Sequence, residues 1–218
     1  MYKKRTLLWT VAGVSAIALS LVGLKLKYAS AKNRRSSKST ESILLIGDSQ
    51  TSRHLGQAFE TTFSEMDVTY FGKPGATHED YLRNPDLINK VNTLPCADVV
   101  YIQLGDNGVS ANTGSILDFV NLIEDKCPSA RVFWGGPMKA VTPSVKSTYV
   151  VTDDPSSPRY LPNYNRMRKV WKDRLSNTLS ETHVTFVDNY DIQESQPDGA
   201  FSDQRLGDGI HLTEDSAQ

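Results

Sequence analysis

Ser49 lies where its sequence context could support chemistry on a bound ligand. Residues 43–46 are four consecutive apolar residues, which indicates a short buried strand, and Gly47 and Asp48 separate this run from Ser49. A helical pattern follows from Thr51, so Ser49 is expected between a strand and the positive end of a helix. Ligands of open α/β sheets bind at this edge. The alternative is that Asp48 and Ser49 only cap the helix, a position that both residue types favour.

The rest of the body must supply the elements that position Ser49. Short apolar or β-branched runs predict further strands at residues 68–71, 98–104, 130–134 and 184–187. Apolar residues at helical spacing predict three helices. The first begins at residue 51, and the other two span residues 115–125 and 163–179. Strands that alternate with helices indicate βαβ units and a mostly parallel sheet.

Residues 138–162 contain four prolines and no clear periodicity. Loops of this length are uncommon in compact domains and are often functional. Tyr149, Tyr160 and Tyr164 either line a substrate cleft or belong to a surface excursion.

Charge divides the chain of 218 residues into two parts. Of its 24 basic residues, nine lie in residues 1–40, which contain none of its 25 acidic residues. The rest of the chain therefore carries 15 basic and 25 acidic residues, a net charge of −10. An acidic body argues against a nucleic-acid partner.

The basic part surrounds an apolar run. Residues 7–24 are eighteen residues without a charge, long enough to cross a bilayer as a helix. Small residues at 29 and 31 have the form of a signal-peptidase site, but lysines at 25 and 27 precede them. We therefore expect residues 1–25 to be a retained membrane anchor, with a cleaved signal as the alternative. Residues 26–42 are expected to form a basic, Ser-rich tether, and residues 43–218 the folded domain.

The orientation of this anchor is open from the sequence. Three basic residues precede the span and six follow it, which by the positive-inside rule would keep the body in the cytoplasm. The first lysines also resemble an export signal. We interpret the protein as a single-pass membrane protein with an extracytoplasmic catalytic domain.

Four short blocks in the body stand in a fixed order. They are Gly47-Asp48-Ser49, Pro74-Gly75-Ala76-Thr77, Gly105-Asp106-Asn107 and Asp208-Gly209-Ile210-His211. This sequence resembles the SGNH hydrolase superfamily, also called GDSL-type esterases and lipases, over roughly residues 41–213. The resemblance implies a three-layer α/β/α sandwich with a five-stranded, mostly parallel sheet of the flavodoxin-like SGNH type.

The resemblance also assigns roles to particular residues. Ser49 would be the nucleophile, His211 the general base, and Asp208 the residue that orients His211. The backbone N–H groups of Ser49 and Gly75 and the side-chain amide of Asn107 would form the oxyanion hole. These residue types suit acyl transfer, because a serine needs a base to take its proton and the tetrahedral intermediate needs donors for its negative oxygen.

Two features depart from the family pattern. The third block usually reads Gly-x-Asn-Asp, and here Gly108 replaces the final Asp, which puts the support of the Asn107 loop in doubt. Asp106-Asn107-Gly108 is also compatible with a simple tight turn. The family usually has a closing helix after its His block, and here only residues 212–218 follow His211.

The sequence thus predicts a membrane-tethered serine esterase that hydrolyses or transfers an O-acyl group. A short acyl group such as acetyl, on a carbohydrate or cell-envelope glycan, is the expected substrate, and no metal or other cofactor is expected. The alternatives are a lipase or lysophospholipase, and a degenerate SGNH domain that binds or assembles without catalysis. The remaining histidines, His54, His78 and His183, are expected to be structural or on the surface.

Cys96 and Cys127 each precede a predicted strand by two or three residues. The family's strand order would make these two strands parallel neighbours, with both cysteines at the edge of the sheet away from the catalytic loops. Neighbouring strands are about 4.8 Å apart, a spacing that a disulfide can bridge. We therefore expect the two cysteines to lie close together, and to be bridged if the body is exported. Two unrelated buried thiols are the alternative.

Overall fold

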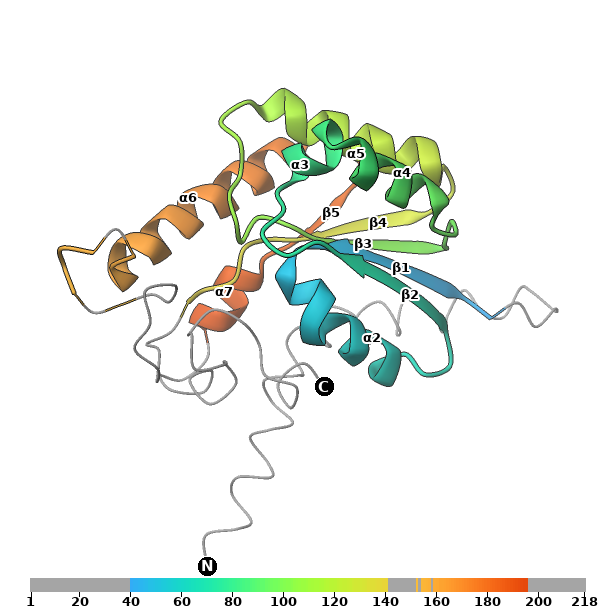
Figure 1. Cartoon of the computed structure of the whole chain (residues 1–218), viewed down its shortest axis with the longest axis horizontal. Helices are drawn as coiled ribbons and strands as arrows, with labels where there is room; N and C mark the ends of the chain where they lie inside the picture. The colour runs from blue at the N-terminus through green and yellow to red at the C-terminus, as the bar shows by residue number, and fades with distance from the viewer. Residues whose placement is uncertain (1–39, 141–151, 153, 158, 196–218) are drawn as a thin grey trace, which may run out of the picture.

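The computed structural model describes residues 40–140, 152, 154–157 and 159–195. A five-stranded sheet forms its centre (Figure 1), and its strands are β1 (Ser42–Gly47), β2 (Asp67–Gly72), β3 (Val99–Gln103), β4 (Arg131–Gly135) and β5 (Thr185–Val187). Their order across the sheet is β2-β1-β3-β4-β5, and all neighbouring pairs are parallel. The predicted parallel sheet is confirmed, with each strand within about one residue of its expected place.

Helices cover both faces of this sheet (Figure 1). One face carries α3 (His78–Arg83), α4 (Pro85–Thr93), α5 (Thr113–Lys126) and α6 (Leu161–Leu179). The other carries a π-helical turn η2 (Thr51–Leu55), α2 (Gly56–Thr62) and α7 (Asn189–Glu194). The three-layer arrangement agrees with the α/β/α sandwich that the sequence predicts.

Two apolar clusters hold these layers together, one on each face. Alternate residues of β1 belong to different clusters: Leu44 and Ile46 face α3–α6, and Ile43 and Leu45 face α2. This follows from the period of two along a strand. Strands buried on both faces are continuously apolar, which is why the run at residues 43–46 could be recognised from sequence.

Three helices were not predicted: α3, α4 and α7 have only six, nine and six residues. Their ends are fixed by polar caps rather than by a long apolar stripe. Thr77 and Asp80 form a reciprocal capping box at the start of α3, and the Asn84 side chain accepts the Asp86 N–H at the start of α4. Short helices of this kind have too few turns to show a period.

The predicted membrane anchor at residues 1–25 lies outside the described residues, as do the tether up to residue 39 and all of residues 141–151 and 196–218. Within the described part of the chain, no helix has both the length and the apolar character needed to cross a membrane. The predicted division of the chain at residue 42 remains a prediction.

The two cysteines lie close together, as predicted. Both are free thiols, and they lie close enough together for the Cys96 thiol to affect the pKa of Cys127. Burial is the main cause that raises the pKa of Cys127 to about 11, and the Cys96 thiol raises it further. No bridge joins them in this structure, so the disulfide stays a prediction for the oxidised protein.

Candidate active site

The carboxyl end of β1 is held in place from three sides. Gly47 has no room for a side chain, because a Cβ there would lie 2.1 Å from Thr51 Oγ1 and 2.6 Å from the Gln103 carbonyl oxygen. Its own carbonyl oxygen accepts the Lys73 N–H at 2.9 Å and the Tyr81 hydroxyl at 2.6 Å. The end of β1 is thereby joined to β3, to the loop after β2, and to α3.

Ser49 follows at the start of the helical segment. The chain is already helical at Ser49 and Gln50, and the π-helical turn η2 begins at Thr51. The Asp48 carboxylate accepts the Gln50 N–H at 3.0 Å, so Asp48 makes the helix-capping type of bond that the sequence allowed for this pair. Ser49 itself is 8% exposed. Single π-helical turns are rare and occur frequently at functional sites.

Three of the four sequence blocks meet at the Asn107 side chain. Its Nδ2 donates to Asp48 Oδ2 at 3.0 Å and to the Ala76 carbonyl oxygen at 3.3 Å. Asp48 precedes Ser49, and Ala76 follows Gly75. The structure therefore brings the predicted oxyanion-hole residues Ser49, Gly75 and Asn107 into one group of loops at the carboxyl edge of the sheet.

Gly75 and the loop of Asn107 need glycine for their backbone. Gly75 has φ of 78°, and Gly105 and Gly108 have φ of 130° and 137°. Residues with a side chain rarely adopt these values. Gly108, which stands where the family usually has Asp, is thus fitted to the conformation of this loop. The loop is supported instead through Asp48, which binds Asn107, and through Asp106, described below.

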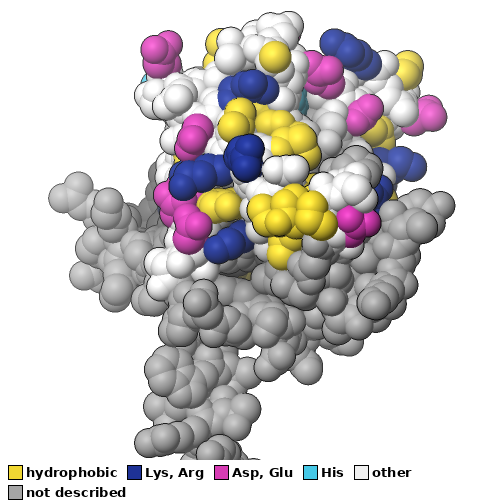
Figure 2. All heavy atoms as spheres, turned by 90° about the vertical axis from the view of Figure 1, so that its left-hand side faces the viewer, with side chains coloured by type: hydrophobic (Ala, Val, Ile, Leu, Met, Phe, Trp, Pro, Cys, Tyr) yellow, Lys and Arg dark blue, Asp and Glu magenta, His cyan; other side chains and the backbone are white. Residues whose placement is uncertain are grey.

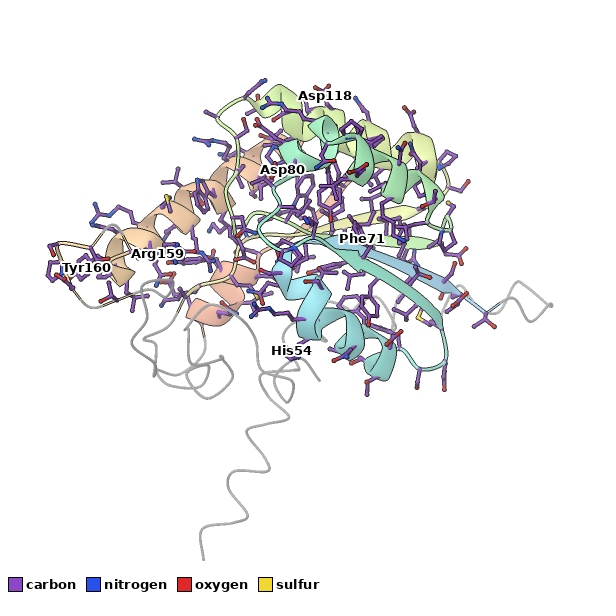
Figure 3. All side chains as sticks on the ribbon, viewed as in Figure 1. His54, Phe71, Asp80, Asp118, Arg159 and Tyr160 are labelled. Carbon is purple, nitrogen blue, oxygen red and sulfur yellow. The ribbon has the colours of Figure 1, made fainter. Side chains whose placement is uncertain are left out.

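The predicted base and its partner, His211 and Asp208, lie outside the described residues, so their assignment remains a prediction. His78 and His183 follow expectation. His78 is buried with Nε2 3.1 Å from Ser115 Oγ, and burial is the main cause that lowers its pKa. His183 is exposed. His54 projects on the α2 side of the sheet (Figure 3), and its Nδ1 is buried without a hydrogen-bond partner among the described residues.

Asp48 carries the strongest electrostatic signal of the site. It is fully buried, and burial raises the pKa of its carboxyl group well above the usual value. The neighbouring charge of Asp106 raises the pKa further, whereas the Gln50 amide and the Arg168 guanidinium lower it. Strong pKa perturbation by burial and a specific charge is typical of functional sites.

A network of buried polar side chains lies behind this site, and the sequence analysis did not predict it. Asp106 Oδ1 accepts the Met138 N–H at 2.9 Å and pairs with Arg168 at 3.2 Å. Gln103 Nε2 donates to the Gly136 carbonyl oxygen at 3.3 Å, and Asn189 Nδ2 donates to Gln103 Oε1 at 3.1 Å. The network connects the ends of β3 and β4 with α6 and α7.

A signal for one part of this network was present in the sequence. The buried residues of α6 are Arg168, Lys172, Leu175 and Leu179, at positions i, i+4, i+7 and i+11. Two leucines at helical spacing define the buried face, and extending that face toward the N-terminus reaches Lys172 and Arg168. The charges at these positions hid the stripe from a search for apolar residues.

The tyrosines of the proline-rich stretch have separate places. Tyr149 lies outside the described residues. Arg159 and Tyr160 lie at the outer end of α6, away from the loops that follow β1 and β3 (Figure 3). Tyr164 packs against Arg168, whose guanidinium carbon lies 4.7 Å from the ring centroid.

Comparison with known proteins identifies this arrangement at the level of the fold. No protein-family model and no curated protein sequence matches the chain. Solved structures do match it. A phospholipase A1 from Streptomyces albidoflavus NA297 aligns with a TM-score of 0.60 and 12% identity, over 82% of this chain and 95% of the other. A Slackia heliotrinireducens protein assigned to the SGNH hydrolases aligns with a TM-score of 0.60 and 14% identity, over 82% and 94% of the two chains.

This chain has the SGNH hydrolase fold. An acetylxylan esterase from Geobacillus stearothermophilus also aligns, with a TM-score of 0.51 and 13% identity over 84% of this chain and 91% of that one. At such low identity the likeness establishes the SGNH fold. The chemistry of this chain has to be argued from its own residues.

Proposed function

We propose that this protein is a serine esterase of the SGNH type. The observation that carries the proposal is the meeting of three sequence blocks at Asn107, which lies 3.0 Å from Asp48 and 3.3 Å from the carbonyl oxygen after Gly75. In this proposal Ser49 attacks an ester carbonyl. The N–H groups of Ser49 and Gly75 and the Asn107 amide then stabilise the oxyanion. His211, oriented by Asp208, takes the Ser49 proton and later returns it to the leaving alcohol.

The substrate we propose is a short O-acyl group, such as acetyl, on a carbohydrate or envelope glycan. Support comes from the likeness to an acetylxylan esterase and from the apolar run at residues 7–24, which would hold the body at a membrane. The phospholipase A1 and an extracellular lipase from Streptomyces rimosus, which aligns with a TM-score of 0.54, favour the lipase alternative equally at the level of the fold. Ester chain length therefore has to be tested directly.

The test is hydrolysis of para-nitrophenyl esters by the purified chain, with Ser49→Ala as the matched control. If the protein is a short-chain esterase, the wild type should hydrolyse the acetate ester, and its rate should fall steeply from the butyrate to the palmitate ester. Ser49→Ala should hydrolyse none of these esters. A preference for palmitate would support the lipase. Equal rates for the wild type and Ser49→Ala would overturn the proposal.

One observation favours a second function, a domain that binds ligands without catalysis. An amide nitrogen has two hydrogens, and both of those on Asn107 are already donated within the protein. An oxyanion would have to displace the longer bond, to Ala76. If the protein is a binding domain, the wild type should hydrolyse no ester. Ser49→Ala should then bind an acetylated oligosaccharide as tightly as the wild type.

The membrane tether and an extracytoplasmic body are also part of the proposal. Residues 1–25 would be the anchor and residues 26–42 the tether. Carbonate extraction of membranes should leave the full chain in the pellet, and protease added outside intact cells or spheroplasts should digest the body. A body protected from that protease would instead support the cytoplasmic orientation that the flanking basic residues favour.

A further inference from the structure

Helix α6 has its polar and apolar residues in unusual places. Arg168 is fully buried and Lys172 is nearly so, whereas Met167 and Val170 of the same helix are 40% and 50% exposed. The face of the molecule at the start of α6 shows hydrophobic side chains among both signs of charge (Figure 2). A buried arginine is costly unless it is paired and hydrogen-bonded. Its place inside the fold therefore calls for a reason beyond packing.

Arg168 makes two contacts with one residue of the loop that follows β3. Its Nη1 lies 3.2 Å from Asp106 Oδ1, and its Nη2 donates to the Asp106 carbonyl oxygen at 3.3 Å. The guanidinium thus holds both the side chain and the backbone of Asp106. It also donates to the Met138 carbonyl oxygen and to the Tyr164 hydroxyl, so the loops after β3 and β4 are joined through one side chain.

Asp106 is the residue directly before Asn107, in a loop with little stiffness of its own. Gly105 and Gly108 flank the pair with positive φ, and the hydrogen bond that closes the turn, from Gly108 N–H to the Gly105 carbonyl oxygen, is long at 3.4 Å. Glycine permits many backbone conformations. The position of Asn107 is therefore fixed mainly by the contacts of its neighbour Asp106 and of its own amide.

We propose that Arg168 is a positioning residue for the oxyanion hole. It holds Asp106 so that the Asn107 amide stays beside Asp48 and the Gly75 loop, where an oxyanion would take the hydrogen that Asn107 now donates to Ala76. The proposal rests on the proposed esterase function for its catalytic consequence. Arg168 does not touch substrate in this account. It acts through Asp106 and Asn107, across the join between α6 and the loop after β3.

The same helix provides a matched control. Lys172 lies one turn further on the same buried face, and its Nζ donates to both carboxylate oxygens of Asp191 at 3.0 Å and lies 3.3 Å from Asp188. Its partners are these two residues at the start of α7 and the neighbouring Asp173 of α6, and none of them is in the Asn107 loop. Lys172→Met and Arg168→Met each remove one buried cation from α6, so both should lower stability, but only the second should disturb Asn107.

The test is a double-mutant cycle on the full-length chain, with kcat and KM measured for para-nitrophenyl acetate. Arg168→Met should lower kcat about 10- to 100-fold, less than the loss of a whole oxyanion donor, with little change in KM. In the Asn107→Ala background the same change should have no further effect, because its route of action is gone. Lys172→Met should leave kcat unchanged in both backgrounds. A wild-type kcat for folded Arg168→Met, or losses that multiply with those of Asn107→Ala, would overturn the proposal.

A second readout does not depend on esterase activity. The two side-chain amide hydrogens of Asn107, assigned by their loss in Asn107→Ala, should give separate and slowly exchanging ¹⁵N–¹H signals in the wild type. Arg168→Met should move them toward the positions of a free amide and speed their exchange, whereas Lys172→Met should not. If Arg168→Met does not fold, Arg168→Lys and Asp106→Asn replace it, with smaller shifts in the same direction. Unchanged Asn107 signals in the folded variants would contradict the proposal even if the protein hydrolyses no ester.

Discussion

Charged side chains are exposed at the amino edge of the sheet, where the strands begin, and buried at the carboxyl edge, where the strands end. At the amino edge, charged groups stay in contact with water: Asp98 accepts bonds from the Ser42 N–H and hydroxyl at 2.9 Å, and Arg131 pairs with Glu41 at 3.4 Å near the surface. At the carboxyl edge, Asp48, Asp106 and Arg168 are all at most 3% exposed. Exposed pairs contribute little to stability and cost little, whereas buried ones are costly unless fully bonded.

Burial of charged groups at the carboxyl edge has a free-energy cost that the amino edge does not have. One sheet, with the same strands, keeps its polar groups exposed at one edge and buries them at the other. Burial keeps water away from these polar groups and fixes their positions. Both effects strengthen the electrostatic interactions that catalysis requires. The carboxyl edge is therefore the region where substitutions should affect chemistry, and the amino edge the region where they should affect stability alone.

The largest expected effect separates two serines at the opposite ends of β1. Ser49→Ala and His211→Ala should each lower kcat about 10⁴-fold or more, because a catalytic triad acts as a unit. Ser42→Ala removes a hydroxyl bonded to Asp98 at the amino edge and should leave kcat unchanged. Steady-state hydrolysis of para-nitrophenyl acetate measures all three. A large loss of kcat in Ser42→Ala would erase the distinction between the edges.

Asn107→Ala should have the next largest effect. Removal of one oxyanion donor costs about 100- to 1000-fold in kcat. Asn112 caps α5 through the Gly114 N–H, so Asn112→Ala should lower the free energy of unfolding by about 1 kcal/mol and leave kcat unchanged. Kinetics and urea unfolding of the two variants provide the comparison. Equal kcat values for both would show that the Asn107 amide has no part in turnover.

At the amino edge, Cys96 and Cys127 should form a disulfide when the protein is oxidised. Oxidised glutathione should convert Cys96 and Cys127 to a disulfide with release of two glutathione thiols, because the two thiols already lie close together. A bridge that closes a loop of this length should stabilise the fold by about 4 kcal/mol. It should leave kcat unchanged, since it forms at the edge away from Ser49. Mass spectrometry under non-reducing conditions and thermal unfolding measure both, and two free thiols after oxidation would rule the bridge out.

The smallest effects concern the pH dependence of stability, which should have opposite signs at the two edges. Hydrogen bonds from Ser42, the largest cause, lower the pKa of Asp98, so its stabilisation is present at neutral pH and is lost as pH falls through the folded-state pKa. Burial raises the pKa of Asp48, so the stability of its protonated form is present below its usual pKa and is lost as pH rises.

Asn substitutions at the two positions test these signs. Asp98→Asn should be about 1 kcal/mol less stable than the wild type at pH 7, and the gap should close toward pH 3. Asp48→Asn should gain stability relative to the wild type as pH rises above 4, since an amide stays neutral. Urea unfolding between pH 3 and 7 measures both gaps. Gaps that change in the same direction would contradict the contrast between the edges.

Much of the sheet could be predicted from the sequence, and the reason is physical. Strands that are buried on both faces, such as residues 43–46, leave an uninterrupted apolar run. The positions of Ser49, Gly75 and Asn107 followed from their places after strands. Parallel strands bring such loops to one edge whatever their distance along the chain.

The buried polar network could not be predicted in the same way. Arg168 and Asp106 lie 62 positions apart, and a charged residue in a helix is usually solvated, so neither residue type nor spacing revealed their pairing. The role of Asp48 was hidden as well, because a Gly-Asp-Ser loop suggests a helix cap. Asp48 does make that bond to Gln50, and its second oxygen holds Asn107, a contact between residues 59 positions apart.

We propose that Ser49 is an activated nucleophile beside an oxyanion hole. The most direct measurement is treatment of the full chain with a fluorophosphonate, followed by peptide mass spectrometry. We expect one phosphonyl group, bonded to Ser49 Oγ with loss of fluoride. It should be absent from Ser49→Ala and should form more slowly in Asn107→Ala. An unlabelled Ser49 peptide, or a label that persists in Ser49→Ala, would contradict it.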